Sequence, residues 1–181
     1  MSQRFAVGQI VPSFAVNDIH HKEVRFPEPK GSVTHLQFRR FAGCPICNLH
    51  LQTFVKRISE VQQADIREVV IFHSTDQQLL PYQGHFPFHV IGDPTKSLYK
   101  KFGVSSSLAA VLSPGSWPAS IKGMFAHDKP RIGFPPHGGP LGLPADFLIA
   151  ANGRVISCHY GKHADDQWTV DDVLSNARSV A

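Results

Sequence analysis

The segment FRRFAGCPICNLHLQTF, residues 38–54, carries two of the chain's three cysteines, Cys44 and Cys47. A strand is expected directly before it, over residues 33–38. Apolar side chains recur at three- and four-residue spacing over residues 48–63, which predicts an amphipathic helix after it. The two thiols are therefore predicted to lie one helical turn apart, at a strand-to-helix junction.

A thiol at the start of a helix is expected to be reactive. The first backbone N–H groups of a helix lack intrahelical partners, and the helix dipole favours negative charge there. We therefore expect a lowered pKa at Cys44, with Pro45 in the first helical turn and with help from Arg39 and Arg40 if they face the site. Cys47, deeper by a turn and more shielded, is expected to resolve a sulfenic acid or mixed disulfide at Cys44 as an intramolecular disulfide.

Composition indicates one soluble domain over residues 1–181. Hydrophobic residues make up 42% of the chain, charged residues 18%, and the formal net charge is +4. No run of Lys or Arg exceeds two residues, so we expect no nucleic-acid partner. No stretch suits a signal peptide or a membrane span, and three cysteines do not form a secreted disulfide framework, so a cytoplasmic location is expected.

The remaining pattern alternates strands with helices, which indicates a central sheet covered by helices. Two extended segments are expected within residues 8–26, and an irregular, proline-rich insert at about 105–143. The other predicted elements are strands at 67–73 and 88–91, a helix at 94–102, a hairpin at 147–159 turning at Asn152-Gly153, and a helix at 169–178.

Other uses of the thiols remain open at this point. Cys158, His159 or His163 would complete a zinc site with the pair, although neighbouring strand residues point to opposite faces. The thiols are alternatively buried and inert, or they belong to a peroxide sensor or binding module with little turnover, whose insert contacts a partner. For redox chemistry we expect neither a metal nor another cofactor. A homodimer is kept as an open alternative.

Several motifs resemble a known family. The strand, the motif Cys44-Pro45-Ile46-Cys47 and the helix are similar to the thioredoxin fold, and residues 142–149 resemble the entry into its hairpin. Residues 8–14 and 93–104 resemble the alkyl hydroperoxide reductase/thiol-specific antioxidant group, the peroxiredoxin-like redoxins. The resemblance implies a thioredoxin-like α/β fold, with a central mixed β-sheet, helices on both faces and an N-terminal β-hairpin.

The resemblance also implies a function. It implies a thiol-dependent oxidoreductase in which Cys44 attacks a peroxide or protein disulfide, with a thioredoxin-type or small-thiol reductant. The residues expected to support the site are Arg40, Phe41, Pro45, Leu143 and Pro144. In the superfamily, the proline that matches Pro144 commonly follows a cis peptide bond and lies against the active disulfide.

The chain departs from peroxiredoxins proper at two points. Gln37 and Phe41 stand where the motif has proline and a Thr or Ser hydroxyl, and no arginine is evident at residues 141–145. We therefore expect thiol redox chemistry, but the missing hydroxyl and arginine argue against fast peroxide reduction by the standard arrangement. Donors that act in the transition state are worth about 10²–10³ in rate.

Five further side chains are secondary candidates. His35 and His137 are candidate proton-transfer groups, with surface or hydrogen-bonded histidines as the alternative. Trp117 and Trp168 are candidate docking residues or core anchors. Asp146 is expected at a solvent-facing edge, with proton transfer from Cys47 as the alternative.

Overall fold

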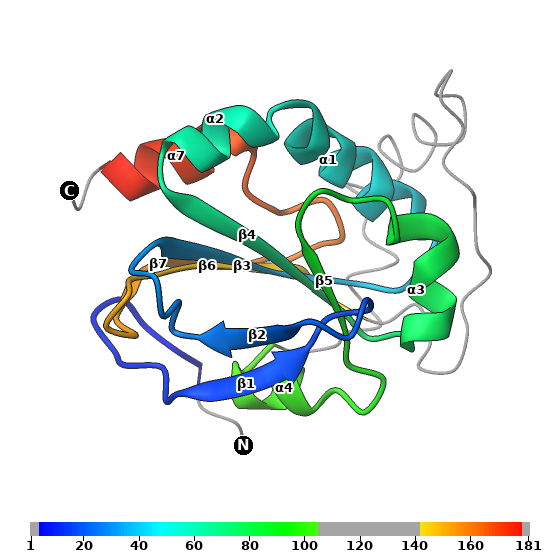
Figure 1. The fold of residues 1–181 in the computed structure, drawn as a ribbon, viewed down its shortest axis with the longest axis horizontal. Coiled ribbons are helices and arrows are strands. Elements are labelled where there is room, and N and C mark those ends of the chain that lie inside the picture. The colour runs from blue at the N-terminus through cyan, green and yellow to red at the C-terminus, as the bar shows by residue number, and fades with distance from the viewer. Residues whose placement is uncertain (1–3, 105–141, 179–181) are drawn as a thin grey trace.

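The fold is built on a five-stranded mixed β-sheet. The computed structural model describes residues 4–104 and 142–178 (Figure 1). The strands of the sheet are β3 (Val33–Arg39), β4 (Ile66–Phe72), β5 (His89–Gly92), β6 (Ala145–Ile149) and β7 (Val155–Tyr160). Their order is β5-β4-β3-β6-β7, with β3, β4 and β5 parallel, β6 antiparallel to β3, and β7 antiparallel to β6. The expected mixed sheet is confirmed.

A hairpin and a short helix cover one face of this sheet, the lower one in Figure 1. They are β1 (Phe14–Asn17), β2 (Glu23–Phe26) and α4 (Ser97–Lys101), and the two strands pair antiparallel. Val24 and Phe26 pack with Leu36 and Phe38 of β3 in one apolar cluster. Burial of this apolar surface, at about 25 cal/mol per Å², holds the hairpin to the sheet.

Three helices cover the opposite face: α1 (Pro45–Lys56), α2 (Ile58–Gln63) and α7 (Val170–Arg178) (Figure 1). Thr169 caps α7 reciprocally, because its hydroxyl accepts the Asp172 N–H at 3.2 Å and its own N–H donates to the Asp172 carboxylate at 2.9 Å. The expected helices on both faces are therefore present. No helix within the described ranges is long and apolar enough to cross a membrane.

The central strand β3 has one apolar face and one polar face. Leu36 and Phe38 point into the hairpin-side core, whereas His35, Gln37 and Arg39 alternate with them toward the helices. All five side chains are fully buried. Buried polar groups need partners, so the polar face must contain its own network of hydrogen bonds and ion pairs.

The expected elements differ from the structure in three places. The helix expected over 48–63 is two helices, α1 and α2, which meet at Arg57. The helix expected over 94–102 is shorter, and Lys96 occupies its N-cap position; the Asp93 carboxylate accepts the Ser97 and Leu98 N–H groups of α4 at 2.9 and 2.8 Å. Helix α3 (Asp76–Gln83) was not predicted from the sequence; it contains Pro81, a residue type that usually interrupts helices. Most of the insert expected at 105–143 lies outside the described residues.

Candidate redox site

Cys44 and Cys47 lie at the carboxyl end of β3, where the chain turns into α1. Gly43, at φ +71°, makes the turn, and Cys44 occupies the N-cap with an extended backbone. Pro45 is the first residue of the helix, as predicted. The Cys44 Sγ accepts the backbone N–H of Cys47 at 3.5 Å, as an N-cap side chain does.

The two sulfur atoms are in direct contact and share one cationic neighbour. The Cys47 Sγ lies 2.8 Å from the Cys44 Sγ, and Arg40 Nη2 donates to the Cys44 Sγ at 3.1 Å. Cys44 is 0% exposed and Cys47 is 1% exposed. The expectation that Cys47 is the more shielded thiol is therefore wrong, since both are equally buried.

The electrostatics place one negative charge on the pair. Burial, together with the hydrogen bond and the charge of Cys47, raises the pKa of Cys44 above its ordinary value, although Arg40 opposes this. Burial also disfavours the charged form of Cys47, but the hydrogen bond from Cys44 and the charge of Arg40 lower the pKa of Cys47 to about 6. The lowered pKa thus belongs to Cys47 and not, as expected, to Cys44, because the second charge would stand directly beside the first.

Arg40 is held in place by the thiols and by Phe41. Burial disfavours its charged form, yet the charges of Cys44 and Cys47 outweigh this and raise the pKa of Arg40. Its guanidinium lies over the Phe41 ring at 5.5 Å, and Phe41 is 7% exposed. Phe41 therefore supports the arginine, while its position offers no hydroxyl to a substrate.

Arg39 faces away from this contact and belongs to the polar network beneath α1. Its Nη2 donates to the Asp146 carboxylate at 2.6 Å, and His35 bridges Asp146 at 3.3 Å and Glu68 at 2.8 Å. Gln37 donates to Glu68 at 2.6 Å. Asp146 is fully buried, so its expected solvent-facing position is wrong. His35 and Asp146 pair with each other within this network.

The network perturbs its own titratable groups. Burial disfavours the charged form of His35, but the charges of Glu68 and Asp146 raise the pKa of His35 to about 9. Burial likewise disfavours the charged form of Asp146, but Arg39 and His35 hold its pKa well below the ordinary value. At neutral pH His35 is therefore positively charged and Asp146 negatively charged. The positive charge of Arg39 also lies against the Asp146 carboxylate.

One site residue was missed, namely His73, which follows β4. Arg39 pairs with Phe72 in the parallel register, so the next residues, Arg40 and His73, also lie side by side, and the His73 N–H donates to the Arg40 carbonyl at 3.0 Å. His73 is 1% exposed. The position of a histidine at the end of a strand beside the thiol-bearing strand was the available signal.

The segment before β6 differs from the expectation in the peptide bond at Pro144. Leu143–Pro144 is a trans bond, and the cis bond of the described residues is Phe26–Pro27. The Pro144 carbonyl accepts the Gly161 N–H at 2.9 Å. Gly142, in the same segment, lies beside Arg40 and His73, because a Cβ there would be 3.0 Å from His73 Nε2 and 3.6 Å from Arg40 Cγ.

The third cysteine lies elsewhere. Cys158 packs against the hairpin-side cluster and donates to the Phe5 carbonyl at 3.6 Å, and His159 pairs with Asp166 at 2.8 Å. Among the residues that the structure describes, no three His, Cys, Asp or Glu side chains are grouped to hold a metal ion. The zinc arrangement with Cys158 or His159 is thus not assembled. His137 and Trp117 lie outside the described residues, and Trp168 stacks with His35 at 6.1 Å.

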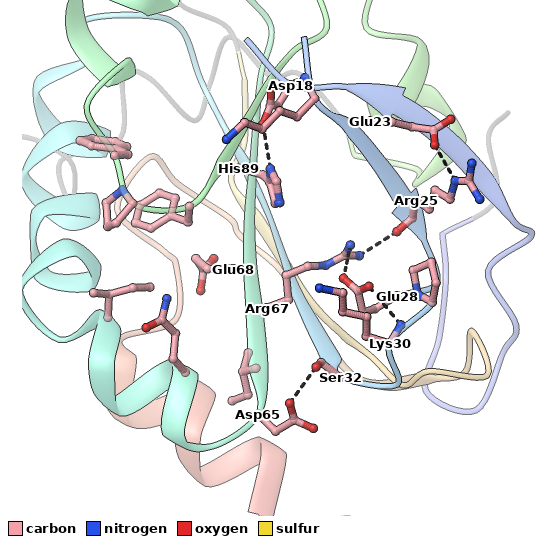
Figure 2. A pocket seen from close by; sticks show the side chains of 18 of the residues that line it. Asp18, Glu23, Arg25, Glu28, Lys30, Ser32, Asp65, Arg67, Glu68 and His89 are labelled. Carbon is pink, nitrogen blue, oxygen red and sulfur yellow. Dashed lines mark hydrogen bonds and ion pairs between the residues drawn. The ribbon is translucent and has the colours of Figure 1, made fainter. Parts of the chain in front are cut away.

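A large cavity, of about 810 Å³, lies at the opposite end of the sheet (Figure 2). It opens beside β2, α2 and the amino ends of β4 and β5. Its charged side chains largely pair with each other: His89 with Asp18 at 2.8 Å, and Arg67 with Glu28. Glu68 links this cavity to His35. Neither thiol lines it, so it is not the entrance to the redox pair.

Comparison with solved structures shows the fold. Peroxidoxin BcpB from Mycobacterium tuberculosis superposes with a TM-score of 0.70 at 16% identity, covering 97% of this chain and 97% of that chain. The reduced Plasmodium vivax 2-Cys peroxiredoxin gives a TM-score of 0.69 at 15% identity, covering 96% of this chain and 81% of that chain. A comparison with curated proteins found no match.

Comparison with family models shows the family. The model described as AhpC/TSA antioxidant enzyme matches residues 53–163, more than half of the chain. The match begins after Cys47 and so does not include the two thiols. The matched region, together with the paired thiols at the start of α1, leads to one conclusion: the chain belongs to the AhpC/TSA antioxidant enzyme family and is a peroxiredoxin-like thiol oxidoreductase with a thioredoxin-like fold.

Proposed function

We propose that Cys44 reduces hydroperoxides as the attacking thiolate and that Cys47 resolves the product. The observation that carries this proposal is the set of donors around the Cys44 sulfur. Arg40 Nη2, the Cys47 N–H and the Cys47 thiol all face it, at 3.1, 3.5 and 2.8 Å. The pair's shared proton has only to cross the 2.8 Å contact to leave the charge on Cys44, where these donors stabilise it.

The chemistry runs in two steps. The Cys44 thiolate attacks the distal oxygen of the hydroperoxide, so that an S–O bond forms, the O–O bond breaks, and the departing alkoxide or hydroxide takes a proton from solvent. Cys47 then loses its proton, and its sulfur displaces the sulfenic hydroxyl, which leaves as water. Two thiols are oxidised to a disulfide while the peroxide is reduced to an alcohol or to water.

Burial of both sulfur atoms favours a small oxidant. A protein disulfide must bring a sulfur atom within bonding distance of the attacking thiolate, whereas Cys44 is 0% exposed. Hydrogen peroxide or a small organic hydroperoxide needs far less space. The proposed reductant is a thioredoxin-type protein or a small thiol, and the proposed location is the cytoplasm, where such thiols are kept reduced.

Sulfenic acid trapping tests which thiol attacks. The Cys47→Ser variant, treated with hydrogen peroxide and a sulfenic acid-specific diketone, is expected to carry the adduct at Cys44. The Cys44→Ser variant is expected to remain unlabelled at residue 47. An adduct at Cys47 in the Cys44→Ser variant, formed at the wild-type rate, would reverse the assignment.

A sensor shares the same disulfide but differs in turnover. With excess reductant and peroxide, an enzyme consumes many equivalents of peroxide per protein, whereas a sensor consumes about one. The partner contact expected of a sensor involves the insert and so lies outside the described residues. The family match supports the enzyme.

A further inference from the structure

His73 is a buried histidine whose ring nitrogens have no hydrogen-bond partner in the described part of the chain. The residue is 1% exposed, yet neither Nδ1 nor Nε2 has a hydrogen-bond partner among the described residues. Leaving a buried polar group unpaired costs about 1–3 kcal/mol. Such groups are uncommon in folded proteins, and each one calls for an explanation, such as a catalytic role or a ligand.

A second buried polar atom without a partner belongs to the arginine at the reactive sulfur. Arg40 donates to the Cys44 Sγ through Nη2, but within the described part of the chain its buried Nε has no hydrogen-bond partner. Arg40 Cγ and His73 Nε2 both lie within 4 Å of the point where a Gly142 Cβ would stand, so the absence of a side chain there leaves them adjacent. His73 is thus a direct neighbour of Arg40, the residue whose guanidinium contacts the Cys44 sulfur.

The surroundings of His73 fix its position and keep its ring neutral. Its ring packs against Phe41 at 6.4 Å and Tyr99 at 5.8 Å between centroids, and its backbone N–H is tied to the Arg40 carbonyl. Burial, with the charges of Lys96 and Arg40, lowers the pKa of His73 to about 4. A neutral imidazole carries one N–H donor and one acceptor nitrogen, both here unused.

We propose that His73 is a catalytic residue that donates a hydrogen bond to an oxygen of the peroxide bound beside Arg40 and Cys44. This inference rests on the proposed function and deepens it, since it names how oxygen is recognised at a site where Phe41 has no hydroxyl. Fixed donors aimed at developing negative charge in a water-poor site contribute strongly to rate.

His73 acts during the attack of the Cys44 thiolate. As the O–O bond breaks, the proximal oxygen leaves with the electron pair, and the His73 N–H and the Arg40 guanidinium share its negative charge. The oxygen then takes its proton from solvent, so His73 keeps its own. The distal oxygen, with its hydrogen, remains on Cys44 as the sulfenic acid.

The test compares two oxidants on pre-reduced protein by stopped flow. Hydrogen peroxide needs donors for oxygen, whereas the neutral disulfide 2,2′-dithiodipyridine does not. His73→Phe is expected to lower the rate constant for peroxide about 10²-fold and to leave that for the disulfide within about 3-fold. His73→Gln, which restores a neutral N–H donor, is expected to recover much of the peroxide rate.

His89→Phe is the matched control, because His89 lies in the distant cavity of Figure 2 and pairs with Asp18. Its peroxide rate is expected to equal that of the wild type. If His73→Phe does not fold, His73→Met takes its place under the same expectation, since methionine fills irregular spaces without donating.

Two outcomes overturn the inference: an unchanged peroxide rate in His73→Phe, or equal slowing with both oxidants. If the Cys44→Ser variant reacts with peroxide as fast as the wild type, the proposed function itself is overturned. That result is visible without any His73 variant, so the two failures are distinguishable.

Discussion

Arg39 and Arg40 are neighbours in sequence, are both buried, and do different things. Arg39 is 0% exposed and binds the Asp146 carboxylate in a network that also holds His35 and Glu68. Arg40 is 6% exposed and, among the described residues, pairs with no carboxylate; its guanidinium contacts the Cys44 sulfur. The first arginine has a fixed opposite charge, whereas the second faces a charge that appears and disappears during catalysis.

The two neighbouring arginines are therefore expected to have different roles: Arg39 stabilises the fold, and Arg40 acts on the reactive thiols. A buried charge with a fixed partner costs little while both are present and much when one is removed. A buried charge whose partner is a thiolate stabilises that thiolate and lowers its pKa. Mutations on the Arg39 side should therefore change stability, and mutations on the Arg40 side should change reactivity.

The largest effect is expected from Asp146→Ala, which leaves Arg39 buried without its carboxylate. We expect a loss of about 3–5 kcal/mol in the free energy of unfolding, measured by urea denaturation. Asp166→Ala is the control, because its pair with His159 is part-exposed and should contribute no more than about 1 kcal/mol. Equal losses in the two variants would contradict the structural role of the network.

Arg40→Met is expected to act on rate. Without the guanidinium, the rate constant of peroxide reduction should fall about 10²–10³-fold, and the pH at which the pair becomes reactive toward iodoacetamide should rise from near the pKa of Cys47, about 6. Arg57→Met, at the junction of α1 and α2 where Arg57 pairs with Glu60 and Asp171, serves as the control. Unaltered alkylation pH in Arg40→Met would show that Arg40 does not stabilise the thiolate.

The Arg39 network also predicts how stability depends on pH. The folded-state pKa of His35 is about 9, above its ordinary 6.5, so this stabilisation is full below pH 6.5 and is lost as pH rises through 9. One proton gives a slope approaching 1.36 kcal/mol per pH unit in that window. His35→Gln should flatten the slope when unfolding is followed from pH 6 to 10. An identical slope in both proteins would place the proton elsewhere.

The smallest effect is expected at Gly142. A methyl group there would stand 3.0 Å from His73 Nε2, so Gly142→Ala must displace the His73 ring by a few tenths of an ångström. We expect a several-fold drop in peroxide rate with little change in melting temperature. Full peroxide activity in Gly142→Ala would show that the position of this ring does not matter.

The sequence predicted the main features because they depend on local patterns. The period of the apolar residues and the position of Pro45 determine α1, and Cys-x-x-Cys at its start identifies the thiol pair. The hairpin at Asn152-Gly153 follows from turn chemistry in the same way. The family resemblance stated from these motifs is confirmed by the family match.

The features that the sequence did not predict depend on contacts between distant strands. Asp146 meets Arg39 only because β6 pairs with β3, and His73 meets Arg40 only because β4 does. The alternation of residues along β3 alone cannot show that its buried face is polar, because the polar partners of that face come from three strands. The pKa order of Cys44 and Cys47 likewise depends on their 2.8 Å contact rather than on the helix start alone.

The most direct test of the account is a thiol count after oxidation. The reduced chain holds three thiols, and one equivalent of hydrogen peroxide is expected to leave one, Cys158, with a Cys44–Cys47 disulfide in the peptide map. The Cys44→Ser variant should keep both of its thiols under the same treatment. Loss of Cys158, or a Cys44→Ser protein that is oxidised as fast as the wild type, would contradict the assignment of the redox centre to Cys44 and Cys47.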